Sequence, residues 1–240
     1  MTGIRPASRS TAARPTSRTL ARWGLIGLIS EIVAVCTWLV AGTWQGPAYS
    51  PVHDDISDMG ALTAPHAWAF LIPQALAGAG SIAFVLFGLR PSLAYDGRAG
   101  RSGPWLAALS GIQDLTDAAF RLDCRAADGC DQARATTSWH AQLHSAIGFA
   151  CVLVLIVTPF VLARRFKRLP QWRRFTVPSV LLGIVFIIGL IAVLAPQTAA
   201  YQGLSQRTIA IGGAVWGIAV AAHVLRLGRN RCPHDPARSA

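Results

Sequence analysis

The sequence has little charge for its length. Charged residues make up 14% of the 240 residues and hydrophobic residues 52%, whereas an average soluble domain has about 25% charged residues. So little charge cannot cover a soluble surface, and lipid must therefore cover part of the chain. There is room for several membrane spans of about 20 residues each and for little else. We expect one membrane domain and no separate soluble domain.

Acidic residues are scarce. There are 11 Asp and Glu against 22 Lys and Arg, which gives a formal net charge of +11. A nucleic-acid-binding protein would need a basic groove with residues that read or stack on bases. Here the basic residues cluster at alternate ends of apolar segments, which is the positive-inside pattern of membrane proteins. We therefore expect no nucleic-acid partner, but a lipid bilayer whose anionic headgroups meet the cytoplasmic basic loops. The basic clusters occupy residues 5–22, 90–101, 164–174 and 226–238.

Six long apolar segments predict an all-α, polytopic helix bundle in the plasma (inner) membrane, with both termini cytoplasmic. The first segment is longer than the roughly 7–15 apolar residues of a signal peptide, so we expect it to remain as a helix. Residues 21–227 form the expected membrane domain, between a disordered basic tail at 1–20 and a second basic tail at 228–240. The six predicted spans are about residues 23–44, 65–89, 104–120, 139–163, 175–195 and 208–225.

The five cysteines include no CxxC pair, which makes a thiolate zinc site a weak prediction. Cys124 and Cys130 lie in residues 121–138, a loop predicted to be outside. The loop of residues 45–64 is acidic, almost free of Lys and Arg, and is also placed outside. Because an oxidising exterior permits disulfides, we expect Cys124 and Cys130 to be bonded to each other. The alternative is a thiolate metal pair.

Polar residues gather at residues 114–144. Asp114 and Asp117 lie one turn apart near the outer end of the third predicted helix, and His140 and His144 one turn apart at the start of the fourth. The short loop between these helices makes them antiparallel neighbours. The four side chains then share one depth in the bilayer, if their faces are turned together. Ionisable groups at such depths are candidates for function.

Two interpretations of this stretch stay open. In the first, His140, His144 and Asp117 bind a divalent metal such as zinc, and a catalytic carboxylate, Asp114 or Asp117, acts as general base on a metal-bound water. In the second, the residues only brace the outer loops, with Asp117 paired to Arg121. The histidine pair lacks the Glu of the HExxH motif, which leaves the metal prediction without its usual support.

Other polar residues are further candidates. Glu31 lies roughly 13 Å into the first predicted helix. It is either protonated and hydrogen-bonded to a neighbouring helix, or part of a proton or substrate relay. The remaining candidates lie at the same outer face as the Asp and His pairs: Asp54, Asp55, Ser57, Asp58 and His66.

Three runs carry a family resemblance: YSPVHDDISDMG, DLTDAAFRLDC and TTSWHAQLHSAIG. They resemble the bacterial and archaeal membrane-protein family catalogued as domain of unknown function 998, over about residues 23–225. This resemblance implies about six spans and no established activity. A weaker likeness is to the membrane hydrolase superfamily of alkaline ceramidases and progestin–adiponectin-type receptors, although helix number and motif order differ. It implies a zinc site whose nearest equivalents here are Ser57, His66, Asp117, His140 and His144.

Three functions are compatible with these residues, and they leave open whether the protein is an enzyme. The first is a metal-assisted hydrolase that acts on a lipid or envelope molecule at the outer face. The second is a small-molecule or proton-coupled transporter with Glu31, Asp114 and Asp117 along its path. The third is a non-catalytic membrane scaffold or partner-binding protein, in which the polar cluster only holds the outer loops.

Overall fold

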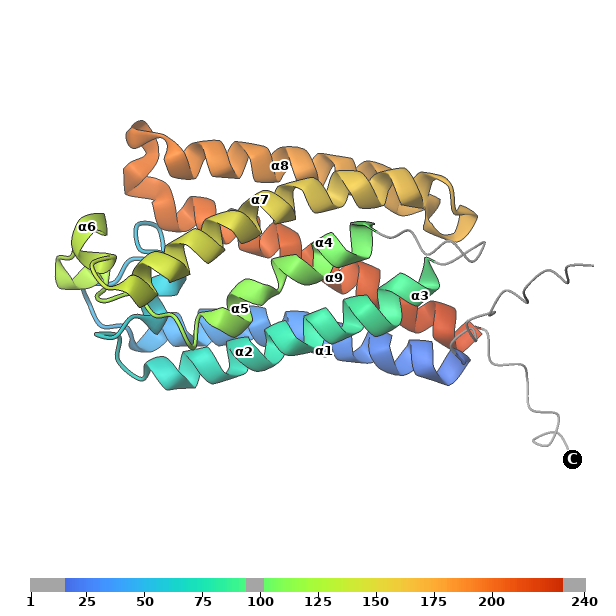
Figure 1. Ribbon diagram of the computed structural model, residues 1–240, viewed down its shortest axis with the longest axis horizontal. Coiled ribbons are helices and arrows are strands. Elements are labelled where there is room, and N and C mark those ends of the chain that lie inside the picture. Colours follow the sequence, from blue (N-terminus) through green and yellow to red (C-terminus); the bar gives the residue numbers. More distant parts are fainter. Residues whose placement is uncertain (1–15, 94–101, 231–240) are drawn as a thin grey trace, which may run out of the picture.

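All regular structure in the described residues, 16–93 and 102–230 of the computed structural model, is helical. Figure 1 shows the long helices side by side in one elongated bundle. The predicted all-α class is therefore confirmed. The α-helices are α1 (Ser17–Ala41), α2 (Ala67–Phe84), α3 (Arg90–Ser92), α4 (Ser102–Ser110), α5 (Ile112–Thr116), α6 (Gln132–Ala135), α7 (Trp139–Lys167), α8 (Thr176–Leu194) and α9 (Gln202–Asn230). Short pieces are η1 (Gly42–Trp44), η2 (Ser57–Gly60), the π-helix η3 (Val85–Leu89), η4 (Ala126–Asp128), η5 (Pro170–Phe175) and η6 (Pro196–Tyr201).

Five helical segments are long and apolar enough to cross a membrane. Their outer surfaces are apolar, as lipid contact requires; Leu76 on α2 and Ile188 on α8, for example, are 68% and 61% exposed. They agree with five of the six predicted spans. The segments are Ser17–Trp44, Ala67–Ser92, Trp139–Lys167, Pro170–Leu194 and Gln197–Asn230.

The third predicted span, residues 104–120, is two short helices rather than one. The amide of Gly111 donates to the carbonyl of Ala108 at 3.2 Å, a three-residue closure that interrupts the α-helix between α4 and α5. Thr116 Oγ1 then donates back to the carbonyls of Ile112 and Gln113 at 3.1 Å. Such back-bonding competes with the helical ladder, and the helix ends at Thr116, before the predicted end.

The ends of the chain also differ from the prediction. Helix α1 begins at Ser17, because Thr16 Oγ1 accepts a hydrogen bond from the Thr19 amide at 3.2 Å and so caps it. The predicted disordered tail therefore includes a helical turn, and its residues 1–15 lie outside the described part of the chain. Helix α9 begins six residues before the predicted span and continues to Asn230. Most of the second basic tail, residues 231–240, and most of the basic loop, residues 94–101, also lie outside the described part.

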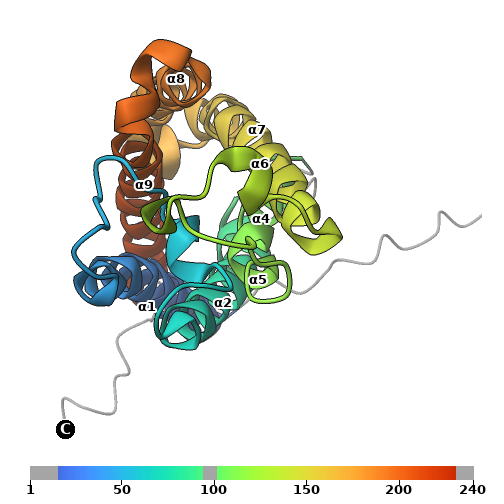
Figure 2. The same ribbon diagram turned by 90° about the vertical axis from the view of Figure 1, so that its left-hand side faces the viewer.

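The helices form a closed ring. Going round it, α1 packs on α2, α2 on α5, α4 on α7, α7 on α8, α8 on α9, and α9 on α1 (Figure 2). The first turn of α1 and the last turn of α9 lie at one end of the bundle, here the terminal end. The connections before α2 and before α7 lie at the opposite end, here the loop end. A ring of this kind leaves an interior that side chains or a ligand must fill.

Apolar side chains fill the ring at the terminal end. Leu20, Leu162, Phe166 and Trp172 are fully buried there, and the rings of Phe166 and Trp172 stack with centroids 4.9 Å apart. A smaller apolar cluster around Trp38, Met59, Phe70 and Leu71 packs loop residues onto α1 and α2 at the loop end. The interior between the two clusters is where polar side chains are found.

Glycines set the approach of α1 to α9. A Cβ added to Gly24 would lie 2.5 Å from the backbone nitrogen of Leu225, and one added to Gly228 would collide with the backbone of Ala21. Small residues at such crossings allow helices to pack closely in membranes. On the same helix α9, by contrast, a Cβ added to Gly213 would meet nothing closer than the Phe186 ring at 3.8 Å.

We predict that Gly24→Ala and Gly228→Ala each destabilise the protein by about 1–3 kcal/mol, because the added methyl group forces α1 and α9 apart. Thermal unfolding of the purified protein in detergent measures this. Gly213→Ala is the matched control and should unfold at the wild-type temperature. Equal unfolding temperatures for all three variants would contradict the close α1–α9 crossing.

Candidate functional site

Two loops cover the loop end of the ring: loop one, residues 42–66, and loop two, residues 117–138. Arg121 joins them, since its Nε and Nη2 donate to the carbonyls of Gly60 and Ala61, each at 2.7 Å. The guanidinium also lies over the Trp68 ring, 5.3 Å from its centroid. Arg121 therefore holds loop one rather than forming the ion pair with Asp117 that the structural interpretation expected.

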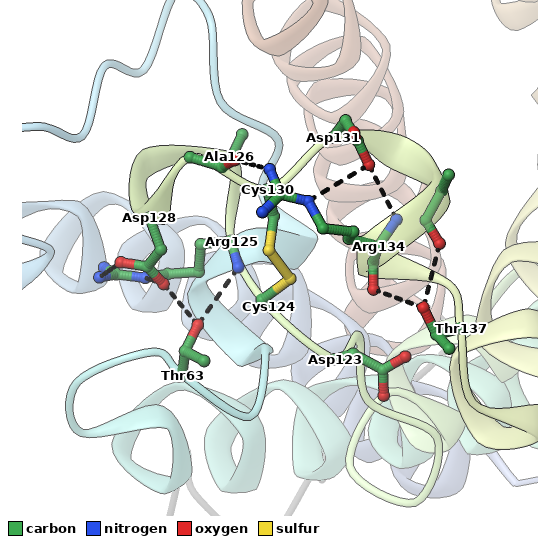
Figure 3. Close-up of a disulfide and its surroundings, with 12 residues drawn as sticks. Thr63, Asp123, Cys124, Arg125, Ala126, Asp128, Cys130, Asp131, Arg134 and Thr137 are labelled. Atoms are coloured by element: carbon green, nitrogen blue, oxygen red, sulfur yellow. Dashed lines mark hydrogen bonds and ion pairs between the residues drawn. A yellow bond between two sulfur atoms is a disulfide. The ribbon is translucent and has the colours of Figure 1, made fainter.

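A second junction surrounds the disulfide. Cys124 and Cys130 are bonded, as predicted (Figure 3). Between them, Arg125 pairs with Asp128 through two hydrogen bonds, and Thr63 of loop one accepts from the Arg125 amide and donates to Asp128. The disulfide thus closes a short segment of loop two whose charged residues are fastened to loop one.

Helix α9 fastens the other side of loop one. Arg207 Nη1 donates to the carbonyl of Asp54 at 2.7 Å, and Nη2 donates to the hydroxyl of Tyr49. The Asp54 carboxylate turns back to its own loop and accepts from the Ser50 amide at 2.8 Å. Asp54, a candidate site residue, therefore serves the loop itself. Arg207 was not among the predicted site residues, because nothing in its surrounding sequence pairs it with a loop about 150 residues earlier.

Beneath this two-loop cap lies a partly open cavity of about 750 Å³ inside the ring. Several of the predicted site residues line it, and they come from α1, α5, α7 and both loops. In the described part of the chain its lining contains no Lys or Arg. Its acidic residues are Glu31, Asp55, Asp58, Asp114, Asp117 and Asp131.

Asp117 and His144 meet in this cavity. Nδ1 of His144 lies 2.8 Å from the Phe120 carbonyl oxygen and 3.3 Å from Asp117 Oδ1. A carbonyl only accepts, so Nδ1 carries the hydrogen, and in the neutral ring Nε2 is then an acceptor. The His144 side chain is 8% exposed and the Asp117 side chain 16%. The pair resembles the orienting half of a general-base arrangement, with a carboxylate beside one ring nitrogen and the other nitrogen free to take a proton.

His140 does not join this pair. Its Nδ1 lies 2.9 Å from the Arg121 carbonyl oxygen and its Nε2 lies 3.7 Å from Asp123 Oδ1, in loop two. The two histidines thus hold successive carbonyls, of Phe120 and Arg121, and only His144 lines the cavity. The predicted metal set of His140, His144 and Asp117 is not brought together. Within residues 16–93 and 102–230, no group of three or more His, Cys, Asp and Glu is placed to hold a metal ion.

Glycines make room for the two deepest carboxylates. Glu31 accepts from Ser81 Oγ at 3.0 Å, and a Cβ on Gly217 of α9 would lie 2.8 Å from its carboxyl carbon. Asp114 packs on α2 in the same way, where a Cβ on Gly78 would lie 2.8 Å from the Asp114 Cβ. Both carboxylates line the cavity. Glu31 is therefore hydrogen-bonded to a neighbouring helix and at the same time faces the cavity, so the two interpretations of this residue are compatible.

Loop one contributes two more carboxylates. Burial raises the pKa of Asp55 from its usual 3.8 to about 6. Burial, and then the nearby charge of Asp55, raise the pKa of Asp58 to about 7. Ser57 lies between them and also lines the cavity. His66, the remaining candidate, instead precedes α2 with a left-handed backbone (φ 52°) and packs edge-on against Trp44.

A comparison with protein families finds one described as "protein of unknown function (DUF998)", whose model matches residues 28–223. No curated protein and no solved structure matches the chain.

We predict that the cap is more stable in mild acid than at alkaline pH. The folded-state pKa of Asp58 lies above its unfolded value, so the folded protein binds the proton more tightly. The stability this contributes falls as the pH rises from about 4 towards 7, by at most about 1.4 kcal/mol per pH unit. Unfolding temperatures measured across this range should fall less steeply in Asp58→Asn than in wild type. The neighbouring Ser57→Ala should keep the wild-type slope; an unchanged slope in Asp58→Asn would refute the assignment.

Proposed function

We propose a function for this chain from the premise that it belongs to the DUF998 family of proteins of unknown function, whose model covers most of its length. The protein, in this proposal, is a hydrolase of the plasma membrane. It binds part of a lipid or envelope molecule in the acidic cavity and cleaves an ester or amide bond there. The observation that carries the proposal is the Asp117–His144 pair in the cavity inside the ring.

The proposed topology has six spans, with the cap outside. Helices α4 and α5 occupy the place in the ring between α2 and α7 (Figure 2) and together extend roughly 22 Å at 1.5 Å per residue. A broken helix is tolerated at membrane depth where neighbouring helices bury it. Arg164, Arg165 and Lys167 end α7 at the terminal end, which favours that end as cytoplasmic. The disulfide of loop two fits an oxidising exterior.

The proposed chemical step uses His144 as general base. Nε2 takes a proton from a water molecule, and the resulting hydroxide attacks the acyl carbon of the substrate. The bond to the leaving alcohol or amine then breaks, and the imidazolium returns its proton to that leaving group. Asp117, beside Nδ1, favours the protonated ring formed in between. Asp114, one turn deeper, also lines the cavity but has no part in this proton transfer.

The zinc prediction gains no support from this geometry. Catalytic zinc normally takes three protein ligands. Asp117 and His144 would provide two, and His140 is engaged by the Arg121 carbonyl. The proposed step therefore uses only water and the side chains of Asp117 and His144.

A transporter is the second candidate, favoured by Glu31 deep on α1. Against a path across the bundle, the fully buried Leu20, Leu162, Phe166 and Trp172 fill the terminal end with apolar side chains. A ligand could therefore enter the cavity from the loop end or from lipid, but could not pass through the bundle to the terminal end. A non-catalytic scaffold would need only the cap. It would not require buried carboxylates as deep in the bundle as Glu31.

We predict that His144→Ala and Asp117→Asn lower hydrolysis by about 100-fold or more, since general acid–base catalysis contributes roughly 10²–10⁴-fold. The protein would be placed in nanodiscs that contain phosphatidylethanolamine, phosphatidylglycerol and an ester-linked glycolipid. Mass spectrometry then detects released acyl chains and headgroups.

The control for this experiment is His140→Ala. It removes the same kind of imidazole-to-carbonyl hydrogen bond one turn away, outside the cavity. It should retain most of the wild-type rate. Wild-type protein that releases no product, or a His140→Ala variant as inactive as His144→Ala, would contradict the proposed function.

A further inference from the structure

The lining of the cavity is acidic and only partly compensated, since Asp131 pairs with Arg134 at its rim and Asp117 lies beside His144. Six of the 11 acidic residues of the chain line it, while the 22 basic residues leave it free of Lys and Arg wherever the structure describes them. A charged side chain away from water is stable only when it is paired, or when it binds a proton and becomes neutral. The cavity therefore favours a ligand that brings positive charge and hydrogen-bond donors.

An unpaired acceptor marks where such a donor would sit. Gln74 of α2 lines the cavity and is 6% exposed, and its side-chain oxygen Oε1 has no hydrogen-bond partner. An unsatisfied buried acceptor costs about 1–3 kcal/mol. A donor supplied by a ligand would remove that cost.

One face of α2 collects the groups around this acceptor. Gln74, Gly78 and Ser81 are spaced i, i+4 and i+7, and so lie on the same side of the helix. Gly78 contacts Asp114, and Ser81 donates to Glu31 at 3.0 Å. The amide oxygen of Gln74 and the carboxylates of Glu31 and Asp114 thus lie along one short stretch of the cavity wall.

The arrangement suits an organic cation better than a metal ion. Metal ligands must converge on a point, and the described residues hold no such group of three. Apolar and aromatic residues, Trp38, Phe70, Phe149 and Phe186 among them, form much of the rest of the wall, beside neutral polar residues such as Gln113. Aromatic walls hold apolar chains and also attract cations. The volume of about 750 Å³ is within the roughly 300–1,000 Å³ of small-molecule sites.

We propose that the cavity binds an amphipathic amine, whose ammonium group sits between Glu31, Gln74 and Asp114 and whose apolar part lies along the aromatic wall. An amphipathic amine would then be the substrate class of the hydrolase. The biological role of the amine site therefore rests on the proposed function. Asp117 follows Asp114 by three residues, or roughly 5 Å along the helix. The bond to be cleaved would therefore lie about one helical turn from the amine.

Decylamine is the probe for this proposal, and binding is measured without turnover. Protein in nanodiscs of neutral phosphatidylcholine is titrated with tritiated decylamine in a scintillation-proximity assay, with empty nanodiscs as background. Decanol and decanoate, of equal chain length, serve as competitors. We expect decylamine to bind at least about tenfold more tightly than either, as a charge-assisted hydrogen bond provides. Equal affinities for decylamine and decanol would overturn the proposal.

Variants locate the amine. Glu31→Gln and Asp114→Asn should weaken decylamine binding roughly tenfold or more and leave decanol binding unchanged, whereas His140→Ala, outside the cavity, should not change decylamine affinity. If neither carboxylate variant alters decylamine affinity, the proposed position is wrong. If either variant fails to fold, the wild-type comparison of decylamine with decanol still decides. Wild-type protein that binds decylamine but hydrolyses nothing would sink the hydrolase and leave the amine site standing.

Discussion

A carboxylate cannot be left facing lipid, and the rest of this structure depends on that constraint. The outer faces of the long helices carry Leu, Ile and Val, while the carboxylates turn into the ring. Six helical segments surround them, and the two-loop cap covers the loop end. The arginines that would neutralise these acids are used elsewhere: Arg121 and Arg125 join the loops, and Arg207 fastens loop one to α9. The interior is therefore acidic, and the arginines that stabilise the loops around it do not line the cavity.

The cap and the ring are therefore one assembly with two tasks. The loops satisfy their own backbone groups through arginine and histidine contacts, so that the cap can close over the cavity without water at every carbonyl. His140 and His144 illustrate the division: each holds one carbonyl of the chain that leaves α5, but only His144 also lies beside a cavity carboxylate. The His144 imidazole thus has both a structural role and the proposed chemical role.

Much of this could be predicted from residue patterns. Hydropathy and charge indicated the helical spans, the disulfide, and the place where polar groups gather, because these are local properties. The break at Gly111 comes from a three-residue hydrogen bond that hydropathy does not reveal. His140 and His144 are separated because they bind different carbonyl groups, those of Arg121 and Phe120. The glycine contacts of Glu31 and Asp114, and the Arg207–loop contact, join residues far apart in the chain. The periodicity of a single segment does not contain that information. The sequence could therefore suggest His140, His144 and Asp117 as metal ligands, but could not show whether they lie together.

The most direct test is whether α2 presents Gln74 to a cavity that a small polar reagent can enter and its neighbour Leu76 to lipid. Cysteine is introduced at either position in a chain whose Cys36, Cys151 and Cys232 are replaced by serine. Intact cells are then treated with a small, membrane-impermeant methanethiosulfonate reagent, which needs water and a thiolate to react. The account predicts rapid modification of Gln74→Cys, at 6% exposure in the folded protein, and none of Leu76→Cys, at 68%. The opposite order, or equal rates, would contradict it.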